Sequence, residues 1–137
     1  MDAAQALADL IEISTQIESA VLVDAQGKVA ATNLGDTARA DTFAGAARDL
    51  LAAAEDSMSG SERGEKLVQL QAVTPDGCVF VVRDDERVVA AVTVPDPTVG
   101  LIFYDLKTCL RHAAGEELAP KPASRSTKEK ESGNGGA

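Results

Sequence analysis

The chain has 137 residues, of which 45% are hydrophobic and 26% charged, and its formal net charge is −9. This length is typical of one domain, its 2 cysteines are too few for a disulfide framework, and no apolar run is long enough to span a membrane. The N-terminus has no basic region typical of a secretion signal, so we expect a cytoplasmic protein with reduced cysteines.

The negative charge is concentrated in the first 113 residues. From residue 114 onward, 4 basic and 4 acidic residues balance each other, which leaves 9 basic and 18 acidic residues in the first 113. Such a surface repels nucleic acid and anionic membranes, and it suits a partner with a basic patch. The same charge is also compatible with a role in solubility alone.

The first part of the chain predicts a helix followed by a β-hairpin. A capping box begins at Asp2, and apolar residues at helical spacing predict an amphipathic helix over residues 3–17. Two short apolar runs, 20–23 and 29–32, then flank an Asp/Gly turn at 24–27. This pattern is typical of a hairpin.

A second helix, rich in alanine, is predicted over residues 37–58, with Asp36 or Thr37 as its N-cap. Its apolar residues cover roughly half of the circumference at about 100° per residue. A helix that lies on one sheet needs an apolar stripe only a little over 100° wide. This helix therefore has more apolar surface than one neighbour requires, and its alanines allow another helix to approach closely.

Three strands follow, at 66–73, 78–83 and 87–94. The turn at 74–77 has proline in its second position, as in a type I turn, and the turn at 84–86 is acidic. Such short connections predict an antiparallel meander. The last two strands are apolar on both faces and should be central, whereas the first alternates glutamine with apolar residues, as a half-exposed edge strand does.

Asp96 and Pro97 predict the N-cap and first turn of a third helix, which should end near Ala113. The remaining chain is polar and is expected to be disordered. We therefore expect a folded domain over residues 1–113 and a tail over 114–137. The element order is helix, strand, strand, helix, three strands and helix, which indicates an α/β protein of the α+β class.

No group of residues in the sequence indicates catalytic or metal chemistry. His112 is the only histidine, and in the last turn of a helix its positive form would interact favourably with the helix dipole. Cys78 and Cys109 lie in core patterns and are expected to be small buried hydrophobes. The loop at 60–66 lacks the spacing of a P-loop, and the turn at 84–86 is expected to be exposed. We predict no enzyme activity, no cofactor and no metal.

Several short strings, taken together with the element order, resemble those of a known family. They are Ala20-Val21-Leu22-Val23-Asp24 followed by Gly27, Leu50-Leu51 near the end of the alanine-rich helix, and Val99-Gly100-Leu101-Ile102 at the start of the last helix. The family is Roadblock/LC7, which includes bacterial MglB proteins and the dynein light chains of roadblock type. The resemblance covers about residues 3–113.

The resemblance implies a profilin-like fold, in which a five-stranded antiparallel sheet has the first and third helices on one face and the second helix on the other. It also implies dimerisation, with third strands paired edge to edge and second helices packed across the interface. Family function is the regulation or scaffolding of small Ras-like GTPases, or of motor complexes, without an active site of the family's own.

Two features that follow from the residues alone agree with such a dimer. An exposed edge strand has to be protected, and the second helix has a surplus of apolar surface; one isologous interface would cover both. We therefore predict seven core or dimer-interface residues, without knowing which of them face inward. They are Phe43, Ala47, Leu50, Ala54, Val68, Leu70 and Ala72.

The sequence thus favours a non-catalytic homodimeric binding module whose partners are itself and a small Ras-like GTPase. An alternative is a scaffold subunit that binds a peptide or another roadblock chain regardless of nucleotide state. A third hypothesis, a small-molecule sensor, rests only on the likeness of such sheets to PAS and GAF domains. Neither nucleic-acid binding nor membrane insertion is expected.

Overall fold

A computed structural model of the chain describes residues 2–57, 68–85 and 87–115. The elements are α1 (Ala3–Ile13), β1 (Ile17–Val23), β2 (Val29–Thr32), α2 (Thr37–Ser57), β3 (Gln69–Thr74), β4 (Gly77–Asp84), β5 (Arg87–Thr93) and α3 (Val99–Ala113). Their order is the predicted one, and the α+β class is confirmed. The loop at 60–66 and the tail after residue 115 lie outside the described residues, and so do the predictions made for them.

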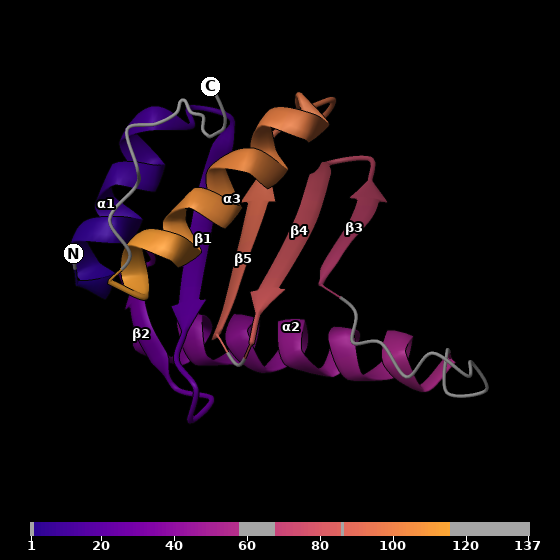
Figure 1. Cartoon of the computed structure of the whole chain (residues 1–137). Helices are drawn as coiled ribbons and strands as arrows, with labels where there is room; N and C mark the ends of the chain where they lie inside the picture. Colours follow the sequence, from indigo (N-terminus) through magenta and orange to yellow (C-terminus); the bar gives the residue numbers. More distant parts are fainter. Residues whose placement is uncertain (1, 58–67, 86, 116–137) are drawn as a thin grey trace, which may run out of the picture.

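The five strands form one antiparallel sheet in the order β2-β1-β5-β4-β3. As predicted, β3 is an edge strand while β4 and β5 lie inside the sheet. Helices α1 and α3 cover one face, and α2 crosses the other face near one end of the strands (Figure 1). This is the layer arrangement that the family resemblance implied.

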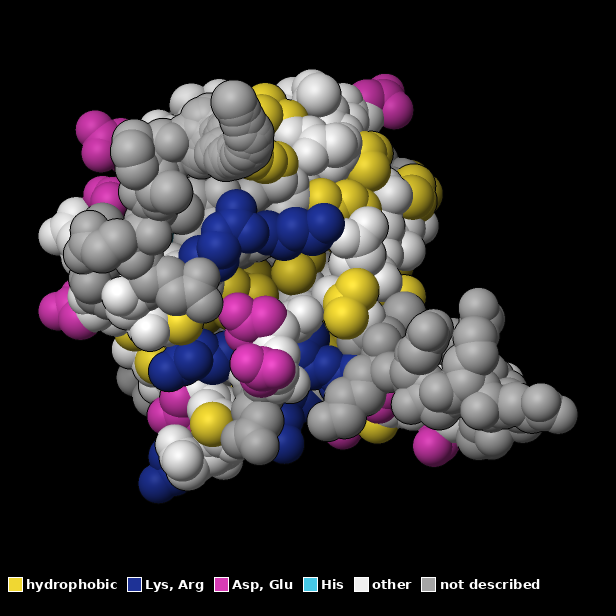
Figure 2. All heavy atoms as spheres, in the orientation of Figure 1, with side chains coloured by type: hydrophobic (Ala, Val, Ile, Leu, Met, Phe, Trp, Pro, Cys, Tyr) yellow, Lys and Arg dark blue, Asp and Glu magenta, His cyan; other side chains and the backbone are white. Residues whose placement is uncertain are grey.

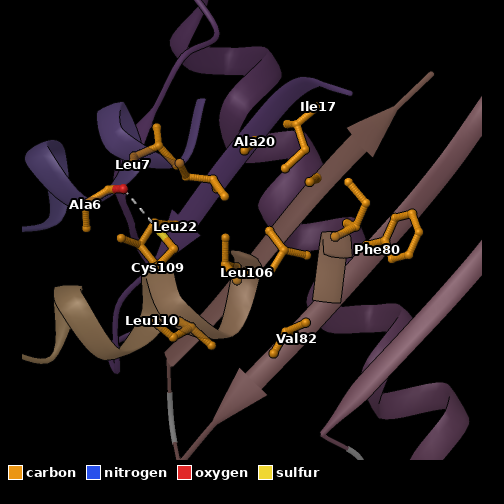
Figure 3. Close-up of a cluster of buried hydrophobic side chains, with 14 of the residues drawn as sticks. Ala6, Leu7, Ile17, Ala20, Leu22, Phe80, Val82, Leu106, Cys109 and Leu110 are labelled. Carbon is orange, nitrogen blue, oxygen red and sulfur yellow. Dashed lines mark hydrogen bonds between the residues drawn. The ribbon is translucent and has the colours of Figure 1, made fainter. Parts of the chain in front are cut away.

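Large side chains fill the layer between the sheet and the α1–α3 pair. Figure 3 shows Leu106 and Leu110 of α3 beside Leu22 of β1 and Phe80 of β4, all of them buried. The ring of Phe80 meets that of Phe103 edge to face, with centroids 5.0 Å apart, a favoured geometry for aromatic pairs. This layer is the larger of the two buried clusters.

The layer beneath α2 is built from smaller residues. Its buried members are Val21 and Val23 of β1, Ala40, Ala44, Ala47 and Leu51 of α2, Val81 of β4, and Val88 and Ala90 of β5. Three of the four α2 residues are alanines, so the helix axis can lie close to the sheet. On β5, adjacent residues such as Val89 and Ala90 enter opposite layers, which is why the strand is apolar on both faces.

The first helix is shorter than predicted: α1 ends at Ile13, not at residue 17. The N–H of Ser14 donates to the carbonyl of Leu10, which closes the last turn, and Ile17 already begins β1. Ile17 is buried in the same layer as Leu10. The apolar period therefore continues past the end of the helix, although the backbone has changed to a strand.

The predicted cap of the third helix is also wrong. Asp96 has a φ of +56°, whereas an N-cap residue adopts extended backbone angles. Thr98 is the N-cap instead, and its N–H donates to Oε1 of Gln16 at 2.9 Å. At the other two helices the caps are aspartates: Oδ1 of Asp2 accepts from the N–H of Gln5, and Oδ1 of Asp36 accepts from the N–H of Ala38, each at 2.9 Å.

Candidate functional site

Helix α2 has two apolar stripes, and the sheet covers only one of them. The covered stripe contains the four buried residues Ala40, Ala44, Ala47 and Leu51. The second contains Phe43, Ala46, Leu50, Ala53 and Ala54, which share a neighbouring side of the helix because residues three or four apart align. Leu50 is 39% exposed, while Phe43 and Ala54 are half-buried. The predicted surplus of apolar surface on this helix is confirmed.

At the sheet edge, β3 presents a row of backbone groups that no described strand pairs with. The N–H of Arg83 donates to the carbonyl of Val68 at 2.8 Å, in line with a register that pairs Gln69 with Val82. Residues in an antiparallel ladder turn their backbone groups alternately toward and away from the partner strand. Three residues of β3 therefore turn their N–H and C=O groups outward: Gln69, Gln71 and Val73.

The side chains of β3 connect this edge to α2. Leu70 lies opposite Val81 and Ala72 opposite Val79, so both point to the face of the sheet that α2 crosses. Leu70, Val79 and Phe43 all pack at the rim of the cluster beneath α2. The open side of the helix and the edge strand thus border the same buried cluster, and together they are here called the α2–β3 surface. Its members are Phe43, Leu50, Ala54, Val68, Leu70, Ala72 and Val79.

Six of the seven predicted interface residues lie on this surface. Val68, just before β3, is 55% exposed, and Leu70 and Ala72 are half-buried. Ala47 differs, because it is only 2% exposed and belongs to the protomer core. Sequence reasoning missed Val79, since an apolar residue in a central strand gives no sign that the helix above leaves it partly uncovered. That the surface forms a dimer stays a prediction.

The opposite side of α2 is polar and borders a cleft of about 500 Å³. An ion pair between Glu55 of α2 and Arg83 of β4 crosses this cleft and ties the helix to the sheet. Arg48 lies against Gly27, whose φ is +83° and where a Cβ would collide with the guanidinium. Because Asp49 adds a further acidic side chain, the lining has no single charge that would select an anion or a cation.

The remaining chemistry-bearing residues lie between α1 and α3. Cys109 is buried, and its thiol lies 3.6 Å from the carbonyl oxygen of Ala6. Burial, and to a smaller extent the nearby carboxylate of Asp9, raise the pKa of this thiol to about 12. Burial also raises the pKa of Asp105, against a hydrogen bond with Ser14 that lowers it. A thiol with such a pKa is a poor nucleophile. His112 lies in the last turn of α3, as predicted.

Neither a metal cluster nor a membrane span occurs in the part of the chain that the structure describes. No three His, Cys, Asp or Glu residues come together there as a possible metal site. None of the helices within the same residues is long and apolar enough to cross a bilayer. The α2–β3 surface, by contrast, places the exposed side chains of Leu50 and Val68 near a sheet edge, which suits protein association.

Comparison with known proteins identifies related folds. A family model described as Roadblock/LC7 domain matches residues 3–93. A Roadblock/LC7 domain from Streptomyces avermitilis is 17% identical with a TM-score of 0.75, and the match covers 84% of this chain and 97% of that one. The gliding protein MglB from Thermus thermophilus is 17% identical with a TM-score of 0.67, covering 82% and 86%. An MglB with a tetrameric arrangement is 15% identical with a TM-score of 0.69, covering 82% and 85%. A search of curated proteins gave no significant match.

Proposed function

Because the chain belongs to the Roadblock/LC7 family, a family of regulatory binding proteins, we propose that it is a homodimeric module that regulates a small Ras-like GTPase without donating a catalytic group. The observation that carries the proposal is the α2–β3 surface, which joins an unpaired strand edge to the uncovered side of a helix. Isolated exposed apolar residues need no explanation, whereas a contiguous patch beside a free edge calls for a partner.

The outward backbone groups of β3 define how two copies would pair. An antiparallel pairing centred on Gln71 places Gln69 of one copy opposite Val73 of the other, so that all three outward-facing residues take part. A register centred on Leu70 would use only two of them. The pairing centred on Gln71 also brings Leu70 beside Ala72 of the second copy, on the face that α2 crosses.

The second helices would complete the same interface. Ala46 and Ala53 flank Leu50 on the uncovered side of α2 and are exposed, and such small residues allow two helices to approach closely. A two-fold axis through the paired strands makes the contact isologous, so each side chain meets the equivalent surface of the other copy. One interface then covers both the open strand edge and the surplus apolar face.

A small Ras-like GTPase fits this dimer as partner in two respects. Regulation or scaffolding of such GTPases is the family function implied by the resemblance, and the first 113 residues carry 18 acidic against 9 basic residues, which suits a partner with a basic patch. The dimer would act by positioning the switch loops of the GTPase, because those loops become ordered or disordered according to the bound nucleotide. The catalytic groups would all belong to the GTPase.

The dimer is tested with Gln71→Pro, which removes an N–H that points away from β4. Proline is tolerated in an edge strand when its missing N–H faces solvent, so the protomer should keep its circular dichroism spectrum. In light scattering coupled to gel filtration, we expect the wild type to be a dimer and the variant a monomer. Gln71→Ala keeps the N–H and should stay dimeric. A dimeric Gln71→Pro variant with a native spectrum would contradict pairing through β3.

The partner is tested by titrating the full chain against the small Ras-like GTPases encoded in the same genome, each loaded with GDP or with a non-hydrolysable GTP analogue. We expect one of them to bind with an affinity that depends on the nucleotide. Equal affinity in both states would favour the scaffold alternative. Absence of binding to any of them, or GTP hydrolysis by the chain alone, would contradict the proposal.

A further inference from the structure

The α2–β3 surface accounts for only two of the large hydrophobic side chains that the described part of the chain exposes, Leu50 and Val68. Val73 of β3 points to the other face of the sheet, since it lies opposite Cys78 of the layer beneath α1 and α3. The remaining four lie at the end of α1 and the start of α3. All five are at least 38% exposed: Ile13, Val73, Val99, Leu101 and Tyr104.

The apolar residues of α1 and α3 gather at one end of the helix pair because the two helices run antiparallel. The thiol of Cys109, late in α3, contacts the carbonyl of Ala6, early in α1, whereas Ile13, at the end of α1, lines a small hollow together with Asp105, nearer the start of α3. Ile13 therefore lies beside the first turns of α3, where Leu101 and Tyr104 are 52% and 61% exposed. Packing among the described residues leaves each of these three side chains at least half exposed.

Charge is divided between the same two helices. The charged residues of α1 are both acidic, Asp9 and Glu12, while α3 carries Lys107 and Arg111 on its outer side. Figure 2 shows this face, with basic side chains over the middle of α3, acidic ones at the border where α1 lies, and further acidic ones directly below the basic side chains. The ion pair found among the described residues joins α2 to β4 and not these two helices. On their outer sides α1 is therefore acidic and α3 basic, while at the border between the two helices Asp9 of α1 lines the same small hollow as Asp105 and His112 of α3.

A second copy of the same face supplies the opposite charge to each of these outer sides. A two-fold axis in the plane of contact, along the seam between α1 and α3, lays α1 of one copy on α3 of the other. Under this rotation the acidic helix meets the basic helix twice, and the apolar end around Ile13, Leu101 and Tyr104 meets its own equivalent. Complementary charge fixes such a pairing and excludes the arrangement in which α1 faces α1.

We propose that the outer face of α1 and α3 binds the same face of a second copy, as a contact separate from the α2–β3 surface. The proposal goes beyond the proposed function, since it joins dimers into larger assemblies. Its charges lie at the surface, where salt screens them over about 10 Å at 0.1 M. Association should therefore weaken strongly as the ionic strength rises.

The test is sedimentation velocity of the full chain over a range of protein concentrations, at low salt and at roughly 0.5 M salt. We expect the mass of the wild type to rise above that of a dimer with concentration at low salt, and to return to the dimer at high salt. Glu12→Lys and Lys107→Glu should each weaken this step about tenfold, the equivalent of one lost interface contact of moderate strength.

The decisive arm combines the two reversals in one chain. Glu12→Lys with Lys107→Glu restores opposite charges across the contact, so we expect larger assemblies to return. Asp41→Lys on the outer side of α2, which changes the net charge by the same amount as Glu12→Lys, should leave the assemblies intact. A wild type whose mass at low salt does not fall when salt is added, or a double variant that associates no better than the single ones, would overturn the proposal.

Failure of the two proposals can be told apart. If the α1–α3 contact exists without the β3 pairing, Gln71→Pro does not lower the mass at low salt, whereas Glu12→Lys does. If only the β3 pairing exists, Gln71→Pro gives monomers and the charge reversals change nothing. A chain that uses both contacts loses the larger assemblies through Glu12→Lys and loses the dimer through Gln71→Pro.

Discussion

The two helical layers of this protein cover their sheet faces to different extents. Two helices lie over one face, with leucines and Phe80 buried between them and the sheet. A single alanine-rich helix crosses the other face and leaves Phe43, Leu70 and Val79 at the rim of a smaller cluster. Large side chains, as in the layer beneath α1 and α3, bury more apolar area and favour stability. Small side chains, as in the layer beneath α2, bring the helix close to the sheet and leave the adjoining part of the sheet face uncovered for a partner.

The first prediction concerns the closed layer and carries the largest expected effect. Phe80→Ala removes a fully buried ring and should lower the free energy of unfolding by about 3–5 kcal/mol. Phe103→Ala should lower the free energy of unfolding by less, because Phe103, the partner in the ring contact, is only half-buried. Urea unfolding at one protein concentration measures both, since dimerisation makes stability depend on concentration. Equal losses would mean that the complete burial of the Phe80 ring does not set its contribution to stability.

The second prediction uses two adjacent leucines of α2 that face different environments. Leu51 is 2% exposed and Leu50 is 39% exposed. Leu51→Ala should cost about 2–5 kcal/mol in unfolding free energy, while Leu50→Ala should change protomer stability by less than about 0.5 kcal/mol. We expect Leu50→Ala to raise the dissociation constant of the dimer about tenfold instead. Sedimentation equilibrium would contradict the α2–β3 surface if Leu50→Ala dimerised as the wild type does.

Much of this contrast could be predicted from the sequence, because the pattern of polar and apolar residues along a strand indicates which of its two faces are buried. The alternation of Gln69 and Gln71 with apolar residues predicted the edge position of β3, and the continuous apolar run of β4 predicted an interior strand. The width of the apolar face of α2 likewise indicated an uncovered side. These features depend on period and composition, which the chain displays locally.

What the sequence did not show depends on contacts between distant segments. Within the apolar half of α2 no polar residue marks the boundary between stripes, so the buried Ala47 could not be separated from the exposed Leu50. Ile17 continued the helical spacing because it enters the same layer from a strand. Asp96 looked like an N-cap, but the hydrogen bond from Thr98 to Gln16, 82 residues away, fixes the start of α3 elsewhere.

The third prediction tests how much the stability of α2 depends on its N-cap, since the side chains that pack this helix on the sheet are mostly small. Oδ1 of Asp36 accepts hydrogen bonds from the N–H groups of Ala38 at 2.9 Å and Arg39 at 3.3 Å. Asp36→Ala should cost about 1 kcal/mol of stability. Asp41→Ala, an exposed position inside the same helix, should change stability by less than about 0.5 kcal/mol. Thermal unfolding of both variants would reject the capping role if their midpoints fell equally.

The last prediction probes a weak point of the closed layer, the carboxyl group of Asp105. Burial raises its pKa above the ordinary value of 3.8, although the hydrogen bond with Ser14 opposes the rise. Because the pKa is higher in the folded state than in the unfolded state, the protonated carboxyl contributes to stability. This contribution is fully present below the pKa of the unfolded state, and it is lost as the pH rises through the pKa of the folded state. Near neutral pH the ionised carboxylate therefore opposes folding.

Asp105→Asn removes that charge while keeping the shape of the side chain. We expect the variant to be more stable than the wild type near pH 7, and the difference to shrink as the pH falls through the raised pKa of Asp105, where the wild-type carboxyl becomes protonated. Urea unfolding across this range measures the difference. Ser14→Ala serves as the opposite control, because losing the hydrogen bond that stabilises the carboxylate should steepen the pH dependence. A difference that grows in acid would show that hydrogen bonding, and not burial, dominates at this seam between α1 and α3.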